Sequence, residues 1–358
     1  MRPASIFQPR LNRERRWFDA PRSTPITLSD DYGVEDSADD EREPLAMADF
    51  LGQQNIKDSL MPLVELAKRS GKPMDHLLLE APTGFGKATL AEAIGTELGS
   101  NVAWLSGRED EYPADWIPKL VGLKKGDVLV VDEIHLIRED IENILYRATS
   151  QFVVTWEVGQ GRGTKEAELA LERFTLIGLT SRLPALSTRM RDRFGSIYRF
   201  LPYDLRAMSL FVVRFARELE VPMTAEGAVE LARRSRGIPQ VAERLLYLIR
   251  DYSEARREGI LTGDIVLSAC SFLKVDRLGL DENDRRFLAT LVSDFGGGPV
   301  GLSGLADALG EYPDAVADTY EPFLMRLRFL VRTPEGRVAT PAAYEYLGLP
   351  RPSGAVTD

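Results

Sequence analysis

The sequence has few of the residues from which disulfides and zinc sites are built. Its 358 residues include one cysteine, Cys270, and two histidines, His76 and His135. A single cysteine excludes a disulfide within the chain, and so few sulfur and imidazole ligands leave no cluster for a zinc site. Any bound metal is therefore expected to be Mg²⁺ held through oxygen atoms.

Long apolar runs are also absent. No segment approaches the roughly 20 apolar residues that span a bilayer, and the start, "MRPASIFQPRLNRERRWF", lacks the apolar stretch of a secretory signal. We therefore expect a cytoplasmic protein with no membrane partner. The net charge of −10 argues against a protein that coats nucleic acid by bulk electrostatics, so any contact with DNA must be local.

The apolar pattern changes several times along the chain. Residues 1–43 are first basic and then acidic without apolar periodicity, which predicts a disordered tail. Over residues 44–204, short apolar runs such as "HLLLEA", "VLVVDE" and "FTLIGLT" alternate with helical patterns, as is typical of a buried parallel sheet flanked by helices. At about 150–173, two alternating segments around Gly159, Gly161 and Gly163 predict an inserted β-hairpin.

The second half of the chain is predicted to be helical before it ends in a hairpin. Helical periodicity runs through residues 205–276, which predicts a small all-helical domain. Residues 277–350 contain helices and then "FLVRTPEGRVAT", where Pro334 and Gly336 are expected to close a tight hairpin. That order suggests a winged helix that binds DNA. Residues 351–358 are expected to form a second tail.

The stretch "LLLEAPTGFGKATLAEAIG", residues 77–95, has the form of a phosphate-binding loop between a strand and a helix. The backbone amides of the loop, at Gly84, Phe85 and Gly86, and the start of the helix are expected to bind phosphate, with Lys87 reaching the β- and γ-phosphates. This context of strand, loop and helix argues against an accidental Gly-Lys turn.

The residues just after Lys87 bear on the metal. Ala88 stands where such a loop ordinarily ends in a hydroxyl that ligates Mg²⁺. The neighbouring Thr89 is expected to point away from the metal, because its side chain leaves the helix about 100° further round. The sequence therefore predicts that nucleotide binds but that the metal is held with one ligand fewer.

Carboxylates and hydroxyls follow the next apolar runs. In "VLVVDEIH", Asp132 is a candidate Mg²⁺ ligand and Glu133 a candidate polariser of the attacking water. An acidic pair at a strand end is usually a solvated terminus, but the phosphate loop favours the functional interpretation here. Thr180 and Ser181 end "LIGLTSR" and offer hydroxyls to orient that water, whereas His135 is expected to pack or hydrogen-bond locally.

The segment "RMRDRFGSIYRF" supplies Arg189, Arg191 and Arg193. A guanidinium donated to the γ-phosphate of a neighbouring subunit stabilises charge in the transition state, and it implies a ring with shared sites. The alternative is a cluster of salt bridges with Asp192. The sequence leaves both interpretations open.

Seven segments, taken in order, resemble the RuvB family of hexameric AAA+ motors that drive branch migration of Holliday junctions. They are "DFLGQQNIK", "DHLLLEAPTGFGKATLAEAIGTELG", "GDVLVVDEIH", "RFTLIGLTSR", "RMRDRFG", "RGIPQVAERLL" and "FGGGPVGLSGLADALGE" with the hairpin that follows. The likeness extends from about Asp49 to Gly348. It implies an α/β AAA+ P-loop domain, an all-helical lid and a C-terminal winged helix.

The resemblance also implies activity and partners. It implies ATP and Mg²⁺ as cofactors, a homo-hexamer on duplex DNA, and an ATP-dependent role in recombination and repair. A RuvA-type junction-binding protein would dock on the inserted hairpin. Carried over by position, the family's roles fall on Lys87 for phosphate, Asp132 for metal, Glu133 as base, Ser181 as first sensor and Arg193 as arginine finger. Arg332 and Arg337 fall where the family's wing touches the DNA backbone.

The sequence departs from the family pattern at five places. These are Ala81 for the first loop glycine, Ala88 for the hydroxyl residue, Gln240 for the second-sensor arginine, Glu43-Pro44 for an Arg-Pro pair, and Glu335 for a basic wing residue. Three of the five lie around the γ-phosphate or its metal. An alternative to the motor is therefore a RuvB-like paralogue that binds nucleotide and DNA but hydrolyses ATP poorly, as a structural or regulatory ring subunit. A clamp-loader-like ATPase is disfavoured by the hairpin and the winged helix.

Overall fold

The computed structural model describes residues 45–107, 112–158 and 165–350. The expected tails at residues 1–43 and 351–358, and the glycines at the expected hairpin turn, lie outside the described residues. The chain divides into two compact units. One unit contains the described residues up to Ala207 together with Ile238–Gln240, and the other contains Met208–Gly237 and the residues from Val241 onward.

The first unit is built on a parallel sheet of five strands in the order β2-β3-β6-β1-β7. The strands are β1 (Leu77–Glu80), β2 (Val102–Ser106), β3 (Val128–Asp132), β6 (Thr175–Thr180) and β7 (Ser196–Arg199). Every residue of β6 is buried, as is β3 up to Val131, which is why these strands read as continuous apolar runs. The predicted parallel sheet is confirmed. Its carboxyl edge collects the residues that follow β1, β3 and β6.

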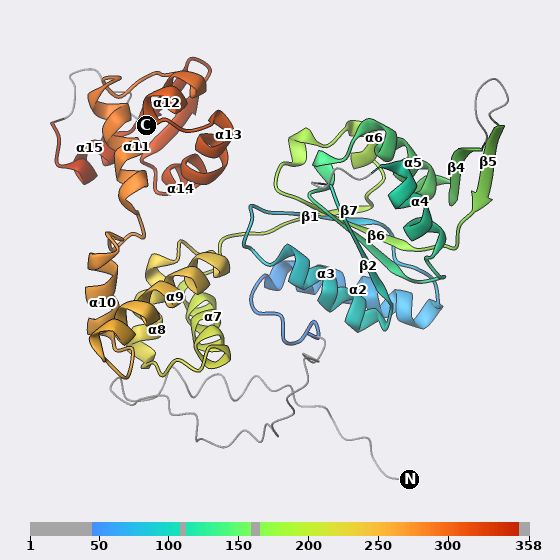
Figure 1. Cartoon of the computed structure of the whole chain (residues 1–358), viewed down its shortest axis with the longest axis horizontal. Coiled ribbons are helices and arrows are strands. Elements are labelled where there is room, and N and C mark those ends of the chain that lie inside the picture. The colour runs from blue at the N-terminus through green and yellow to red at the C-terminus, as the bar shows by residue number, and fades with distance from the viewer. Residues whose placement is uncertain (1–44, 108–111, 159–164, 351–358) are drawn as a thin grey trace, which may run out of the picture. The chain divides into compact units, whose positions relative to one another are not determined.

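Helices cover both faces of this sheet (Figure 1). The helices α2 (Gln54–Ser70) and α3 (Lys87–Leu98) lie on one face, and α4 (Pro113–Val121), α5 (Glu139–Ser150) and α6 (Thr188–Arg191) lie on the other. Two short 3-10 helices follow β3 and β6, η2 (Ile134–Leu136) and η4 (Leu183–Ala185). Trp116 and Leu145 pack with Leu129 and Val131 in a core between the sheet and α4 and α5. The predicted layers of helix, sheet and helix are therefore present.

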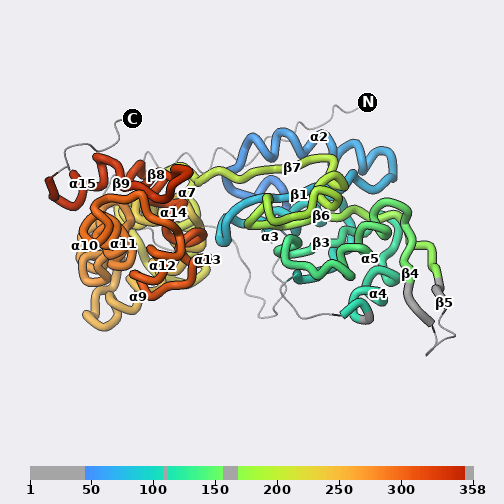
Figure 2. The backbone as a smooth tube through the Cα atoms, turned by 90° about the horizontal axis from the view of Figure 1, so that it is seen from above, coloured from blue at the N-terminus to red at the C-terminus, as the bar shows by residue number. Residues whose placement is uncertain are grey.

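The predicted hairpin insertion is also confirmed. Strands β4 (Val153–Val158) and β5 (Lys165–Ala170) pair antiparallel, with Val153 opposite Ala170 and Val158 opposite Lys165. In both views of the backbone the hairpin extends away from the main sheet, beyond α4 and α5 (Figures 1 and 2).

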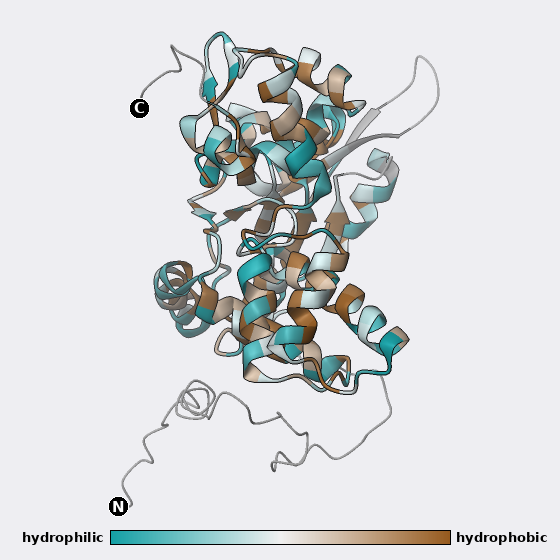
Figure 3. Ribbon diagram, turned by 90° about the vertical axis from the view of Figure 1, so that its left-hand side faces the viewer, coloured by the Kyte–Doolittle hydropathy of each residue, from teal (hydrophilic) through white to brown (hydrophobic). Residues whose placement is uncertain are grey.

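Four helices follow, α7 (Leu205–Glu218), α8 (Ala225–Arg234), α9 (Pro239–Arg256) and α10 (Gly263–Phe272). All but the first residues of α7 and α9 belong to the second unit. Two of the helices start at threonine caps, because the hydroxyl of Thr224 accepts the amide of Gly227 at 3.1 Å and that of Thr262 accepts the amide of Ile265 at 3.4 Å. Hydrophobic and hydrophilic residues form stripes on the helices (Figure 3). None of the helices in the described part of the chain is long and apolar enough to cross a membrane.

The last domain is a winged helix. Its elements are α11 (Glu282–Ser293), α12 (Leu302–Leu309), α13 (Pro313–Ala315), the π-helical turn η5 (Val316–Tyr320), α14 (Glu321–Arg326), β8 (Leu330–Thr333), β9 (Gly336–Ala339) and α15 (Pro341–Leu347). A core that includes Phe287, Leu305, Leu324 and Tyr344 joins the helices to the wing. The predicted order of helices followed by a hairpin is therefore confirmed.

The wing differs from the prediction in the role of Gly336. The turn consists of Pro334 and Glu335, while Gly336 is already paired with Thr333 in the ladder. The φ of Gly336 is 146°, and a Cβ atom there would lie 2.4 Å from the carbonyl oxygen of Val300. Glycine is therefore required because the backbone of Val300, which forms an isolated β-bridge with Arg337, lies against this position, and the tight turn itself is made without it.

Candidate functional site

The phosphate loop joins β1 to α3. Gly84 and Gly86 both have a φ of 88°, a region that favours glycine, and the second of them is the N-cap of α3. Gly86 has no side chain with which to cap the helix, so the amides at the start of α3 point toward an external acceptor. The curl and the uncapped helix start suit the binding of phosphate, as predicted for this segment.

Gln240 lies directly against this loop. Its backbone amide donates to the carbonyl oxygen of Gly84 at 3.3 Å. A Cβ atom built on Gly84 would stand 2.6 Å from the side-chain oxygen of Gln240, so a larger residue at position 84 could not coexist with it. The structure thus brings Gln240, which the resemblance places at the second-sensor position, to the loop as an uncharged amide.

The ammonium group of Lys87 is held inside the loop. The side chain is buried, and its Nζ donates to the carbonyl oxygens of Ala81 at 2.6 Å and Pro82 at 3.3 Å. The same atom lies 4.0 Å from Oε1 of Glu133. The loop therefore fixes one positive charge between its own carbonyls and the carboxylate that follows β3.

Glu133 and Ser181 meet at the carboxyl edge of the sheet. One carboxylate oxygen of Glu133 accepts the Ser181 amide at 2.9 Å and the Ser181 hydroxyl at 2.8 Å. Burial raises the pKa of the Glu133 carboxyl, but the hydrogen bonds from Ser181 and the charge of Lys87 lower it by more, so the pKa lies below its ordinary value. The carboxylate is therefore ionised and oriented, which is the state that a general base requires.

The backbone of Glu133 is left-handed, with φ 45° and ψ 50°. For a residue with a Cβ atom this conformation costs about 1–2 kcal/mol. The surrounding hydrogen bonds hold it there, and strained residues of this kind are concentrated at functional sites.

His135 is part of this carboxylate's environment, which the sequence did not indicate. Its Nδ1 lies 3.3 Å from Oε2 of Glu133 and 3.0 Å from the hydroxyl of Thr180. The prediction that His135 hydrogen-bonds locally is confirmed. Thr180 is fully buried, so its hydroxyl contacts His135 and the amide of Arg182, and the outer hydroxyl at this strand end is that of Ser181.

Asp132 ends β3 one residue before Glu133. Its Oδ1 accepts the amide of Glu133 at 3.0 Å, and it is paired in register with Ser106 on β2. Within the described residues, no group of three or more acidic, histidine or cysteine side chains could hold a metal ion. One carboxylate still fits Mg²⁺, which commonly takes few protein ligands and completes its shell with phosphate oxygens and water. Ala88 is exposed but offers no side-chain oxygen, and the hydroxyl of Thr89 is likewise at an exposed position.

Tyr203 supports the loop from outside and was not predicted. Its hydroxyl donates to the carbonyl oxygen of Phe85 at 2.9 Å, and its ring would collide with a Cβ atom on Gly52. Burial raises the pKa of Tyr203 to about 12, although a hydrogen bond with Gln53 opposes that rise, so the phenol stays a donor. Nothing in "LPYDL" signals this role, because the contact depends on how the chain returns to the loop after β7.

The three arginines around α6 form no ion pair with Asp192 in the part of the chain described. Arg189 donates to Oδ1 of Asn143 at 2.7 Å, and Arg191 to the carbonyl oxygens of Leu183 and Leu186. Arg193 donates to the carbonyl oxygen of Thr149 at 3.3 Å and is only partly buried. The alternative of a salt-bridge cluster with Asp192 is therefore not what the structure shows.

Arg332 and Arg337 lie in the other compact unit, on the two strands of the wing. Each donates to Glu321 at the start of α14, with Nε of Arg332 2.6 Å from Oε2 and Nε of Arg337 2.7 Å from Oε1. The partner Glu321 was not predicted. A glutamate before proline is common at the start of a helix, and nothing in the local sequence predicts that it accepts hydrogen bonds from arginines on later strands.

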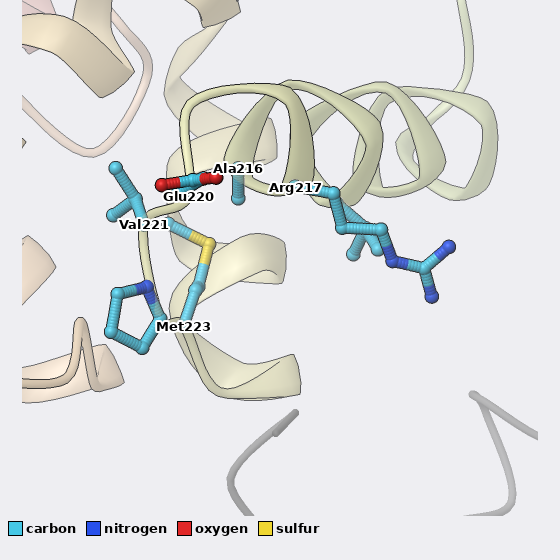
Figure 4. A pocket seen from close by; sticks show the side chains of 7 residues that line it. Ala216, Arg217, Glu220, Val221 and Met223 are labelled. Atoms are coloured by element: carbon cyan, nitrogen blue, oxygen red, sulfur yellow. The ribbon is translucent and has the colours of Figure 1, made fainter. Parts of the chain in front are cut away.

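A shallow pocket on the lid has a different character (Figure 4). It is lined by residues at the end of α7 and the loop that follows: Val213, Ala216, Arg217, Glu220, Val221, Pro222 and Met223. Most of these side chains are aliphatic, and Figure 4 shows the guanidinium of Arg217 directed away from Met223. The pocket does not have the convergent polar groups that a phosphate ligand requires.

Comparisons with known proteins cover most of the chain. The model of the Holliday junction DNA helicase RuvB P-loop domain matches residues 42–200, the RuvB AAA lid domain matches residues 203–276, and the RuvB C-terminal winged helix domain matches residues 277–348. The Holliday junction branch migration complex subunit RuvB of Chloroflexus aurantiacus is 43% identical over 328 residues, which are 92% of this chain and 93% of that protein.

Two further proteins agree with this assignment. The RuvB subunit of Thermomicrobium roseum is 46% identical over 309 residues, 86% of this chain and 88% of its own. The solved structure of the Thermotoga maritima RuvB Holliday junction branch migration motor superposes with a TM-score of 0.77 at 37% identity, covering 86% of this chain and 98% of that one. The chain therefore belongs to the RuvB family.

Proposed function

We propose that this protein hydrolyses ATP and uses the energy to drive branch migration of Holliday junctions in recombination and repair. The observation that carries the proposal is the arrangement of Lys87, Glu133 and Ser181, which places a buried ammonium 4.0 Å from an ionised carboxylate. The relatives' names support the DNA substrate, since they are called subunits of a Holliday junction branch migration complex.

Each residue near the loop has a distinct role in this proposal. The amides of residues 84–89 and the ammonium of Lys87 bind the phosphates, and Asp132 holds Mg²⁺ through water or directly. When bound, Mg²⁺ neutralises charge on the phosphate oxygens. Glu133 polarises the attacking water, and the two hydrogen bonds from Ser181 orient its carboxylate.

Assembly and partners are part of the same proposal. We propose a cytoplasmic homo-hexamer in which Arg193 reaches the γ-phosphate bound to the next subunit. Its partial exposure and its long bond to a main-chain carbonyl support this, because the group is not committed to an ion pair with Asp192. A RuvA-type protein would bind the β4–β5 hairpin, which extends away from the sheet.

For the domains we propose residues 44–204, 205–276 and 277–350, with the hairpin inserted at about 150–173. The matches to the three family models support this division. Duplex DNA would contact the wing through Arg332 and Arg337. The second of these is supported less well, since 18% of its side chain is exposed against 46% for Arg332.

A second candidate function is favoured by two observations at the loop. Ala88 supplies no hydroxyl to the metal, and Gln240 places an amide where a cation would face the γ-phosphate. These residues suit a ring subunit that binds nucleotide and DNA but turns ATP over slowly. The two candidates share the fold and the DNA site, so only a rate separates them.

The test is steady-state ATP hydrolysis and junction branch migration by the full chain, with a synthetic Holliday junction and a RuvA-type protein. If the protein is a motor, the junction should stimulate hydrolysis, and branch migration of the junction should require ATP. A Glu133→Gln protein serves as the control, because it keeps the size of the side chain but cannot act as a base. Hydrolysis by the wild type no faster than by this control would exclude the motor and leave the slow subunit.

A further inference from the structure

The start of α14 holds a carboxylate that is fully buried and yet bonded to two arginines on other elements. Glu321 has no exposed side-chain surface. Its Oε2 accepts Arg332 and its Oε1 accepts Arg337. A buried charge of this kind is costly unless it is paired, and here it is paired twice.

The two arginines face each other across the wing at close range. Arg332 on β8 and Arg337 on β9 are direct partners in register. The backbone amide and carbonyl of Arg337 both bond to Val300, so Arg332 and Arg337 form a pair without backbone hydrogen bonds between them. In antiparallel sheets such pairs bring side chains closest together, and like charges directly opposite destabilise the sheet. Glu321 offsets that repulsion, and the two guanidinium groups with one carboxylate leave one net positive charge.

The two arginines are not equivalent. Arg337 is mostly covered, with 18% of its side chain exposed, whereas 46% of Arg332 is exposed. Arg332 also donates to the carbonyl oxygen of Ala317 at 3.4 Å, so contacts on α14 and η5 fix one side of its guanidinium. The exposed side of a group that is already ordered can bind a phosphate with little further loss of side-chain freedom.

We propose that Glu321 is a positioning residue for DNA, which orients Arg332 toward the backbone of a duplex. Its second bond, to the less exposed Arg337, holds the carboxylate in place. The inference rests on the proposed DNA-binding function of the wing. A negative side chain ordinarily weakens the binding of DNA, which is a polyanion. In this proposal Glu321 strengthens it instead.

The experiment compares two carboxylates of the same wing in the full-length protein. Glu321→Gln removes the buried charge, and Glu335→Gln removes the exposed one in the turn between β8 and β9. Binding to a fluorescent duplex is measured from 50 to 300 mM salt, where the slope of log affinity against log salt counts phosphate contacts. We expect Glu321→Gln to weaken binding about tenfold, as expected for loss of a charge-assisted contact, and to flatten the slope by roughly one unit. Glu335→Gln should bind as tightly as the wild type or more tightly.

Two further variants establish whether Glu321 acts through Arg332. In an Arg332→Ala background, adding Glu321→Gln should cause no further loss, since coupled residues are not additive. Glu321→Asp keeps the charge but is too short to reach both guanidinium groups, so it should also weaken binding. If circular dichroism shows that the Glu321→Gln protein does not fold, binding by the Glu321→Asp protein tests the positioning role.

The outcomes separate the inference from the function on which it rests. If Arg332→Ala binds like the wild type at every salt concentration, the wing is not a DNA site and both proposals fail. If Arg332→Ala weakens binding while Glu321→Gln or Glu321→Asp binds as tightly as the wild type, the DNA function stands and the positioning role is overturned.

Discussion

Among single residues, Ala88 and Gln240 are the two that we propose to limit the rate of ATP hydrolysis. We expect Ala88→Thr to raise turnover by restoring a metal ligand, and Gln240→Arg to raise it further. A charge-assisted hydrogen bond to the γ-phosphate contributes about 1.5–3 kcal/mol, or roughly 10- to 100-fold in rate if it is made only in the transition state. Hydrolysis is measured at saturating Mg²⁺ and DNA.

The position of Gln240 supplies the control for this comparison. Gln240→Ala removes the side chain that contacts Gly84 without adding a cation, so a rise in turnover that occurs with Gln240→Arg and not with Gln240→Ala can be assigned to the added charge. If the wild type hydrolyses ATP as fast as the double variant, other groups compensate for both substitutions. The slow ring subunit would then be excluded and the motor would stand.

Asp284 on α11 gives a prediction about pH. Its Oδ2 accepts Arg236 at 2.6 Å and the amide of Asp281 at 2.9 Å, while Oδ1 is buried with no partner among the described residues. Burial raises the pKa of Asp284 to about 6, although Arg236 opposes the rise. Between roughly pH 4 and 6 the folded protein keeps a proton that the unfolded chain releases. The resulting stabilisation is complete below pH 4 and is lost as the pH rises through 6.

The test is the difference in Tm between the wild type and Asp284→Asn, which is neutral at every pH. This difference should be more favourable to the wild type at pH 4.5 than at pH 7.5, and should change mostly below pH 6.5. Other titrating groups contribute equally to both proteins and cancel. A difference that is constant over this range would place the pKa of Asp284 near its ordinary value.

Among the elements, the wing depends on the approach of Val300 to β9. Gly336→Ala should destabilise the winged helix by on the order of 3 kcal/mol, because a Cβ atom would meet the backbone of Val300 and φ would be unfavourable as well. Gly310→Ala is the matched control, since Gly310 has a positive φ of 68° with open space around it. That variant should cost only about 1 kcal/mol. Thermal unfolding of the full chain measures both, and equal losses would show that the contact with Val300 is unimportant.

Elements whose formation depends on neighbouring residues were predictable from the sequence, and contacts between distant elements were not. The strands β3 and β6 are buried on both faces, so their sequences are continuous apolar runs. The loop before α3 is recognisable because glycines and a lysine must occur at fixed spacing. The bonds from Tyr203 to the loop and from Glu321 to the wing join segments that no local pattern connects.

For the whole molecule, the proposal that Arg193 reaches the site of a neighbouring subunit can be tested with mixed rings. Arg193→Ala should bind ATP but hydrolyse it at least ~10³-fold more slowly, as expected for loss of an arginine finger. Mixing it with a Lys87→Ala protein should restore some turnover, because a mixed ring contains interfaces at which both groups are intact. A verified mixed oligomer without recovery would mean that Arg193 acts within its own subunit or not at all.

The division into compact units affects how the protein can be cut into fragments that still bind nucleotide. Ile238–Gln240 belong to the α/β unit, although the residues on either side of them belong to the other. A fragment that ends at Ala207 would keep Lys87, Glu133 and Ser181 but would lose the residue that covers Gly84. We expect such a fragment to release a fluorescent ATP analogue faster than the full chain does, as measured by stopped flow. Supplying the missing part as a separate polypeptide should not restore the slow rate at micromolar concentration, because the tether that keeps Gln240 at the loop would be cut.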